Sequence, residues 1–456
     1  MRRSIALLAA VAALFIAACE NDVNRLHPWG ADSYYGPGNG YDWTADTAGM
    51  TDKVPALAEC SLDEVNLWVL DTMWDMYLWY DQLATGIDFR GDQEPDEFLH
   101  SIMYKTSDHF SYVAKKEDHD GYYSGRYYGF GFGFRKLPEY MVYVTLVIPG
   151  GPADTAGMRR GQRIVAIDGK TVQEIEDQNL WGTVTSRPED EKEIPIVYVV
   201  EEAGEEKTLT LYAGDVTAPS IYKATTLTVG KKKVGYLMLK SFINSTNDEL
   251  DAAFAKFKAD AVTELVVDLR YNGGGWLDGS EHLASLITGG DLKDKLFTRL
   301  TYNGKHQDYN SDYHFKDYSQ SLELTKVAFI ATGGTASASE VVINGLKPYI
   351  EVAIIGDTTY GKPVGMNPMN HCDYTLVPIT FKLANADAYG DYFDGMPADC
   401  AADDDVTRDF GDPEEGSLKA ALSYLNDKTC PAATVRSWRP GELDIRTVPY
   451  QMGWLF

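Results

Sequence analysis

A serine and a lysine of this sequence stand where they could act together as a nucleophile and its base. Ser337 lies in the segment GGTASASE, which runs into an apolar stretch of helical character. The first turn of a helix favours a developing negative charge, although an isolated serine there is more often only a helix cap. Lys362 follows 25 residues later. If desolvated, it could lose its proton near neutral pH and activate the serine for acyl transfer.

A glycine-rich segment could provide the third requirement of such chemistry, a site for an oxyanion. Gly273, Gly274 and Gly275 follow the strand-like run TELVVDLR. Glycines carry no side chain, so their backbone N–H groups can approach a negatively charged oxygen closely. Taken alone, the segment predicts no more than a turn.

Alternating strand-like and helix-like segments after Ala218 should bring these groups together. Helices are expected over residues 246–260, 280–288 and 337–349, each between apolar strand-like runs. Such alternation favours βαβ crossovers and a largely parallel sheet, whose strand ends meet at one edge. The glycines, Ser337 and Lys362 all follow such strands, so we expect them at that edge.

The chain ahead of this region divides into a helical part and a β-rich part. Apolar residues at helical spacing after a capping Ser61 predict an amphipathic helix, and a second helix is expected over residues 95–105. We interpret the aromatic stripe of the first helix as core packing. Short β-like runs separated by Gly and Pro occupy residues 127–213 and predict a small β-rich module.

The β-rich module resembles a PDZ domain of the bacterial protease type. The residues of its GFGF run, Gly129, Phe130, Gly131 and Phe132, precede IPGGPADTAGMRRGQRIVAIDG, whose motifs fall in the order that such domains have. In such a domain, backbone N–H groups of the loop hold a terminal carboxylate while the adjacent strand edge accepts the peptide. The resemblance therefore implies binding of protein C-termini.

Three motifs together resemble those of the C-terminal processing (tail-specific) serine peptidases of family S41. They are DLRYNGGG over residues 268–275, SASE over residues 337–340 and GK over residues 361–362. The resemblance implies an α/β peptidase core of ClpP/crotonase-like fold, a serine endopeptidase activity and no metal or organic cofactor. It makes Ser337 the nucleophile, Lys362 the general base, and the backbone N–H groups of Ala338 and one glycine of the DLRYNGGG loop the oxyanion donors.

One departure and two alternatives accompany this interpretation. Relatives with the Ser/Lys pair often have Gln four residues after the lysine, where this sequence has Met366. What would orient Lys362 is therefore open. His109, in a segment Asp-His-Phe-Ser, could serve as the base instead, as in tricorn-like relatives. A binding protein of the same fold, with little or no turnover, is the third reading.

The N-terminus carries the signature of an exported lipoprotein. Arg2 and Arg3 precede an apolar run of signal-peptide length, and the run ends in Ala17, Ala18 and Cys19. We expect cleavage before Cys19, or alternatively an ordinary cleavage near Ala18. Lipid at Cys19 would anchor the protein in the bacterial cell envelope, on the outer-membrane, periplasmic or surface side. The formal net charge of −27 disfavours nucleic acid as a partner.

Four further cysteines allow disulfides in an oxidising compartment, and they are Cys60, Cys372, Cys400 and Cys430. Cys400 with Cys430 is the first pairing to expect. Their spacing is no metal signature, and we interpret the His-Cys-Asp run at residues 371–373 as structural.

The predicted fold is an α/β protein with a β-rich module. We expect a signal peptide at residues 1–18, a tether at 19–60, a helical domain at 61–120, a PDZ-like domain at 121–216, a peptidase core at 217–385 and a C-terminal segment with a helix at 386–456. Proteins or peptides with free C-termini are the expected substrates.

Overall fold

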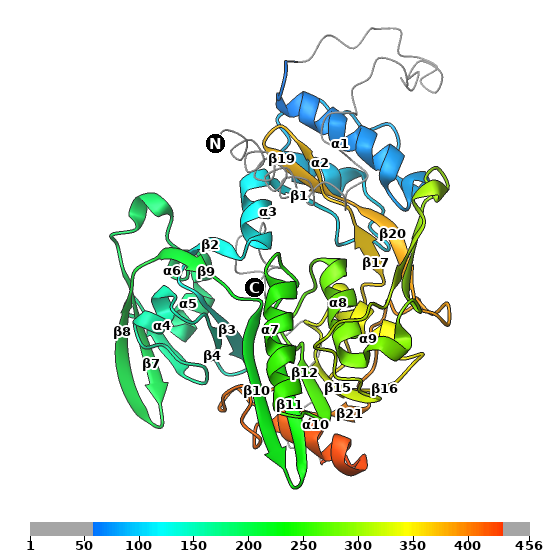
Figure 1. The fold of residues 1–456 in the computed structure, drawn as a ribbon. Helices are drawn as coiled ribbons and strands as arrows, with labels where there is room; N and C mark the ends of the chain where they lie inside the picture. Colours follow the sequence, from blue (N-terminus) through cyan, green and yellow to red (C-terminus); the bar gives the residue numbers. More distant parts are fainter. Residues whose placement is uncertain (1–57, 432–456) are drawn as a thin grey trace, which may run out of the picture.

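The structure, a computed structural model, describes residues 58–431. The predicted signal peptide, Cys19 and most of the predicted tether lie outside the described residues. Among residues 58–431, no helix combines the length and the apolar character needed to cross a bilayer. Figure 1 shows a helical region at the top, a β-rich module at one side and a larger α/β core.

The helical region begins with the expected amphipathic helix, α1 (Leu62–Met76). Ser61 caps it, since its side chain accepts the N–H of Glu64 at 3.4 Å. The second expected helix, α2, begins at a proline, which suits a first turn, and ends three residues earlier than predicted. The region also contains η2 (Tyr80–Gln82), α2 (Pro95–Ile102), β1 (Tyr112–Lys115) and α3 (Lys116–Tyr123).

The helical region is not an independent layer, because its core is shared with strands from the far end of the chain. Val69, Met73 and Phe98 are fully buried in one cluster with Val364 and Ile379. The aromatic stripe of α1 packs against this same cluster, as the sequence predicts for core residues. The region therefore lies directly on the strands that follow the Lys362 loop.

The β-rich module is built on a sheet of order β3-β4-β5-β7-β8, with β6 paired to β5. Its strands are β2 (Arg126–Gly129), β3 (Phe132–Leu137), β4 (Met141–Val147), β5 (Arg163–Ile167), β6 (Lys170–Thr171), β7 (Ile196–Glu202), β8 (Glu205–Leu211) and β9 (Gly214–Thr217). Its helices are α4 (Pro152–Thr155), α5 (Val172–Asp177), α6 (Trp181–Val184) and η3 (Glu189–Glu191). Trp181 and Tyr198 fill the interior. Among the described strands β3 pairs only with β4, so it forms an edge of this sheet.

The core sheet has the order β10-β11-β12-β15-β16-β21, and every pairing in it except β10-β11 is parallel. This confirms the parallel sheet predicted from the alternation. Its strands are β10 (Ile221–Val229), β11 (Lys232–Leu239), β12 (Glu264–Asp268), β15 (Lys326–Ala331), β16 (Glu351–Gly356) and β21 (Cys400–Ala401). The parallel strands are apolar and buried on both faces, as such sheets require.

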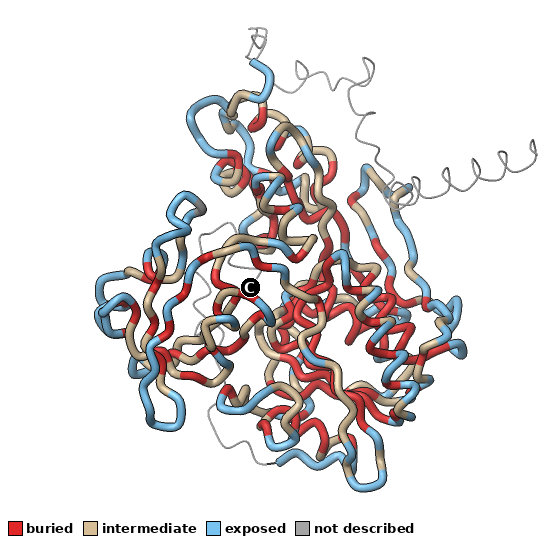
Figure 2. The backbone as a smooth tube through the Cα atoms, turned by 60° about the vertical axis from the view of Figure 1, so that its left-hand side comes forward, coloured by how far each residue is buried: buried red, intermediate tan, exposed pale blue. Residues whose placement is uncertain are grey.

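Helices cover both faces of the core sheet (Figure 1). One face packs against α7 (Thr246–Ala259), α8 (Leu277–Thr288) and α9 (Ala338–Leu346), and the other against α10 (Gly416–Asp427). Figure 2 shows that buried residues concentrate in this sheet and its flanking helices. All four helices were expected from the sequence, and the ends of α7, α8 and α9 differ from the predicted ones by up to three residues.

A second sheet, of order β14-β13-β20-β17, connects the core to the helical region. It was not predicted. Its strands are β13 (Leu296–Tyr302), β14 (Ser311–His314), β17 (Val364–Met366) and β20 (Ile379–Ala384), and the hairpin β18 (Met369–His371) with β19 (Tyr374–Val377) pairs with β1. The remaining short helices are η4 (Gly290–Leu292) and η5 (Gln307–Tyr309).

The described chain contains two disulfides. Cys400 and Cys430 are joined, as expected from the sequence, and Cys60 is joined to Cys372 across 312 residues. The second bond ties the start of α1 to the β18–β19 hairpin.

Candidate active site

Three loops meet at the carboxyl edge of the core sheet. One follows β12 and carries the glycines, one follows β15 and carries Ser337, and one follows β16 and carries Lys362. The loops contact one another through the backbone, because Ala336 donates to the carbonyl of Asn272 at 3.2 Å and Tyr360 to that of Thr335 at 2.9 Å. The edge predicted from the βαβ pattern is thus a single packed surface.

Ser337 stands at a sharp turn between β15 and α9. Its φ is +55°, in a region that a residue with a side chain enters only when its surroundings hold it there. It is the cap residue of α9, and its own N–H donates to Oε2 of Glu340 at 3.0 Å. The serine is partly exposed while its neighbours Ala338 and Ser339 are buried. The serine therefore reaches the surface of the site while the residues that follow it are packed inside.

Glu340 joins the serine loop to the lysine loop. Its Oε2 accepts N–H groups from both Ser337, at 3.0 Å, and Lys362, at 2.8 Å. Its Oε1 accepts from the Thr359 hydroxyl at 2.6 Å and from Gly361 N–H at 2.8 Å. Burial raises the pKa of this carboxyl, and the four donors act in the opposite direction. One buried carboxylate therefore fixes the two candidate residues by their backbones.

The Lys362 side chain lies in largely apolar surroundings. Its Nζ is 5.1 Å from the centre of the Phe110 ring and donates to Sδ of Met366 at 3.0 Å. Desolvation lowers the pKa of Lys362 to about 8, although the charges of Asp108 and Glu340 oppose the shift. In the described part of the chain no hydrogen bond links Nζ to Ser337. The Lys362 ammonium thus has only a weak acceptor in Met366, and its pKa lies about one unit above neutral pH.

Met366 is the hydrogen-bond partner of the Lys362 side chain. A thioether sulfur is a weak acceptor, so it can direct Nζ without stabilising the charged form as an amide oxygen would. The sequence left open what would orient Lys362, and in the structure the Met366 sulfur accepts a hydrogen bond from Nζ. The unbranched side chain reaches Nζ because β17 returns along the lysine loop.

The three glycines differ in what their backbone can do. The Gly274 N–H is already used, because it donates to Oδ1 of Asn272 at 2.9 Å. Gly273, Gly275 and Ala338 donate to no acceptor among residues 58–431. A Cβ added to Gly274 would lie 2.7 Å from Cβ of Ser337 and 3.1 Å from the Ala338 nitrogen. The glycine loop therefore packs so closely against the Ser337 turn that there is no room for a side chain at Gly274.

Asn272 and Asp108 support the site, and no role was assigned to either from the sequence. Asn272 is fully buried, and its amide donates to the carbonyl of Leu239 at 3.1 Å, which anchors the glycine loop to β11. Asp108 accepts from the Tyr77 hydroxyl at 2.7 Å, from the Ser111 hydroxyl at 2.6 Å and from two backbone N–H groups. These bonds hold the loop that places Phe110 beside Lys362. The spacing of an acid two residues ahead of Phe110 was the available signal.

The arginine of the DLRYNGGG segment has a structural place. Arg270 is buried and binds Asp404 and Glu415, each at 2.8 Å. Burial alone would raise the pKa of Asp404, but Arg160 and Arg270 hold it well below its ordinary value. Arg160 comes from the β-rich module and also donates to the Tyr271 hydroxyl at 3.0 Å. This network joins the module, the glycine loop and the C-terminal segment.

His109 lies near the site but makes no hydrogen bond to Ser337 within the described chain. Its exposed ring is 4.2 Å from the Phe110 ring and 6.5 Å from the Tyr360 ring, measured between centres. Desolvation lowers its pKa from the ordinary value of 6.5, the charge of Asp108 opposes that change, and Lys362 adds to it.

The GFGF loop, which the sequence predicts to bind a terminal carboxylate, lies between β2 and the edge strand β3. Gly129 ends β2, and Phe130 and Gly131 turn the chain into the edge strand β3. The carbonyl groups of Phe130 and Gly131 are used, accepting from Ala153 and Ile148 at 2.8 Å. Their N–H groups donate to no acceptor in residues 58–431. Phe132 begins the strand, partly exposed.

Comparison with known proteins identifies three regions of the chain. Residues 64–112 match the peptidase S41 N-terminal domain, residues 143–180 match a PDZ domain, and residues 233–396 match peptidase family S41. The PDZ match lies within the β-rich module, and the peptidase match covers the core that carries the three loops.

Similar proteins agree with these matches. A "Probable CtpA-like serine protease" of Staphylococcus aureus strain COL is 26% identical over 325 residues, which cover 69% of this chain and 62% of the relative. A protein of Staphylococcus saprophyticus with the same name is 25% identical over 285 residues, covering 62% of this chain and 55% of the relative. The chain thus spans less than two thirds of the length of these curated relatives.

A solved structure supports the fold over most of the described chain. The crystal structure of a protein from Bacteroides fragilis NCTC 9343 that is described as an S41 protease has a TM-score of 0.69 and 25% identity, covering 84% of this chain and all of that one. The predicted fold class, a PDZ-like module with an α/β peptidase core, is confirmed. The chain is thus similar to peptidase family S41 over residues 64–112 and 233–396, and a match to a PDZ domain lies between these two regions.

Proposed function

We propose that the chain is a serine endopeptidase that holds protein C-termini in its PDZ domain and cleaves peptide bonds with Ser337 and Lys362. One observation carries the proposal. The buried Glu340 carboxylate binds the backbones of both residues, while the lysine side chain lies among apolar neighbours that lower its pKa to about 8. A lysine with that pKa is partly neutral near pH 7 and can accept a proton.

The mechanism follows from these positions. Neutral Lys362 accepts the hydroxyl proton of Ser337 as Oγ attacks the peptide carbonyl carbon. The oxyanion accepts hydrogen bonds from the backbone N–H groups of Ala338 and of Gly273 or Gly275. These N–H groups have no other acceptor in the described chain. The lysine ammonium then protonates the leaving amine, and the acyl group stays on Oγ. Water, deprotonated by Lys362, releases it as a carboxylate.

Labelling with a fluorophosphonate tests the nucleophile directly. We expect covalent modification of Ser337 in the wild-type chain and none in Ser337→Ala, read by peptide mass spectrometry. The reagent reacts only with an activated hydroxyl. If a folded wild-type protein stays unlabelled on long exposure, the chain is a binding protein of this fold and has no useful turnover.

The pH dependence tests the base. Because Lys362 must be neutral to act, kcat/KM is expected to rise with pH through a midpoint near 8, the value to which desolvation brings its pKa. A histidine base would place this limb below pH 6.5, since desolvation lowers the pKa of His109. We would measure kcat/KM for one peptide between about pH 5 and 10. A limb below 6.5 that disappears in His109→Ala would transfer the base role to histidine.

The PDZ domain should make cleavage depend on a free C-terminus. The N–H groups of Phe130 and Gly131 have no acceptor in the described chain, and β3 offers an open edge for the peptide. Amidation of a substrate removes the charge that these groups would bind, so kcat/KM should fall by about 10- to 100-fold. A series of matched free-acid and amidated peptides measures this. Equal rates would show that the domain does not select C-termini.

The place of action rests on the sequence alone. Cys19 lies outside the described residues, so lipid attachment there and a location in the bacterial cell envelope remain proposals. Proteins or peptides with free C-termini are the proposed substrates.

A further inference from the structure

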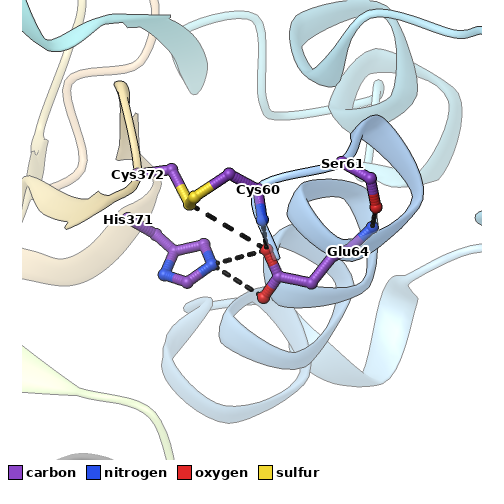
Figure 3. The surroundings of a disulfide bond; sticks show 5 residues. All are labelled: Cys60, Ser61, Glu64, His371 and Cys372. Carbon is purple, nitrogen blue, oxygen red and sulfur yellow. Dashed lines mark hydrogen bonds and ion pairs between the residues drawn. A yellow bond between two sulfur atoms is a disulfide. The ribbon is translucent and has the colours of Figure 1, made fainter. Parts of the chain in front are cut away.

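Four side chains of types that commonly bind metals, from residues outside the proposed active site, gather at the start of α1 (Figure 3). Cys60, just ahead of the helix, forms a disulfide with Cys372 of the turn between β18 and β19. Glu64, in the first turn of α1, has Oε2 4.0 Å from the Cys372 sulfur. His371 places Nε2 at 2.8 and 2.9 Å from the two Glu64 oxygens.

The local folding of the chain fixes these groups. Ser61 caps α1 by accepting the Glu64 N–H, and the Cys60 N–H donates to Oε2 of Glu64 at 3.2 Å. The His371 ring lies 5.1 Å from the Trp68 ring on the next turn of the helix. Both ends of the disulfide are thus held by their own elements, so the four side chains would stay close together without the sulfur-sulfur bond.

The other disulfide of the described chain shows what is unusual here. Within residues 58–431, the polar partner of the Cys430 sulfur is the backbone carbonyl of Asp399, at 3.7 Å. Between residues 58 and 431, the single group of three or more His, Cys, Asp or Glu side chains with mutually close ligand atoms is Cys60, Glu64 and Cys372, whose atoms lie within 4.8 Å of one another. His371 adjoins this group through Glu64.

A disulfide stabilises a neighbouring carboxylate little, because its sulfurs are neutral and form only weak hydrogen bonds. Reduced, the same sulfurs become thiolates, which bind divalent metals tightly. Two thiolates, an imidazole and a carboxylate are the donors that tetrahedral zinc takes in proteins. The positive end of α1 also favours a thiolate at Cys60.

We propose that Cys60, Glu64, His371 and Cys372 form a zinc site when their disulfide is reduced. A dithiol reductant supplies two electrons and two protons, is itself oxidised to a disulfide, and leaves two cysteine thiols. Zn²⁺ then displaces the two thiol protons and binds both sulfurs, Nε2 of neutral His371 and one oxygen of Glu64. Tetrahedral bonds of about 2.3 Å need the sulfurs about 3.7 Å apart, a small change between elements whose Cα atoms are 5.8 Å apart.

The start of α1 and the β18–β19 hairpin would then be joined in two ways, by the disulfide when oxidised and by zinc when reduced. In either state the start of α1 is tied to the β18–β19 hairpin, which follows β17 and Met366 directly. Reduction in the presence of zinc would therefore preserve the packing of the helical region on the strands beside Lys362.

Metal binding by the whole chain tests the proposal. The protein is reduced anaerobically with a phosphine, and Zn²⁺ binding is titrated against a chromogenic chelator, with Co²⁺ absorption reporting thiolate ligation. We expect no tight binding by the oxidised protein and one equivalent per reduced chain. Glu64→Gln and His371→Gln should each weaken zinc binding by at least about tenfold. Cys400→Ser/Cys430→Ser, the matched control, should bind zinc as the wild type does.

Three results would overturn the proposal. One is a reduced protein that binds no zinc. Another is wild-type affinity in both Glu64→Gln and His371→Gln, which keep the disulfide and can first be shown to be folded when oxidised. The third is binding lost in the Cys400 and Cys430 control. If reduction unfolds the chain, the circular dichroism spectrum should recover on adding zinc, and failure to recover also counts against the site.

Discussion

Ser337→Ala is expected to lower kcat/KM by about 10⁴-fold or more, and Lys362→Ala by nearly as much. Without the hydroxyl no acyl-enzyme can form, and without the amine nothing takes its proton. The double variant should be little worse than either single one, because nucleophile and base act as a unit. Steady-state hydrolysis of one peptide by the three variants measures this.

Two neighbouring residues serve as comparisons for this experiment. Ser339 is buried and its hydroxyl donates to the carbonyl of Asn272 at 3.0 Å, so it supports the loop and does not face the substrate. Ser339→Ala and His109→Ala should both keep measurable turnover. Complete loss in a folded His109→Ala with retained activity in Lys362→Ala would contradict the Ser/Lys assignment.

The core fold could be predicted because its signals are local. Buried parallel strands such as β12 and β15 are short apolar runs, and helices between them have recognisable periodicity. The second sheet gave no such signal. β13 pairs with β20 although nearly eighty residues separate Tyr302 from Phe381, and a pairing over that distance depends on tertiary packing.

The site was predictable in its reacting groups and not in what holds them. Ser337 and Lys362 could be named from strand ends, but the position of Glu340 required the loops to be folded. The spacing Ser-x-x-Glu at residues 337–340 is a capping-box pattern, which is typical of a hydrogen bond between these two residues at the start of a helix. That the same carboxylate also binds the Lys362 backbone is visible only in three dimensions. The Cys60–Cys372 bond is equally remote in sequence.

Gly274→Ala is expected to lower kcat/KM by about 10²- to 10³-fold in a protein that still folds, the size of effect that follows the loss of an oxyanion donor. The new methyl group would lie 2.7 Å from Cβ of Ser337, 3.0 Å from the Ala336 carbonyl oxygen and 3.1 Å from the Ala338 nitrogen. Something must move, and what moves is the turn that carries the nucleophile and the N–H group proposed to bind the oxyanion.

Gly91→Ala separates this steric effect from backbone strain. Gly274 has a φ of +109° and Gly91 one of +134°, so alanine is strained at both positions, yet a Cβ at Gly91 meets nothing within 4 Å. Both variants should lose some thermal stability, and only Gly274→Ala should lose activity. Kinetics and thermal unfolding of the two proteins, side by side, measure the difference. If Gly274→Ala keeps wild-type kcat/KM, the glycine loop does not contribute to the site, and the oxyanion would have to be bound without it.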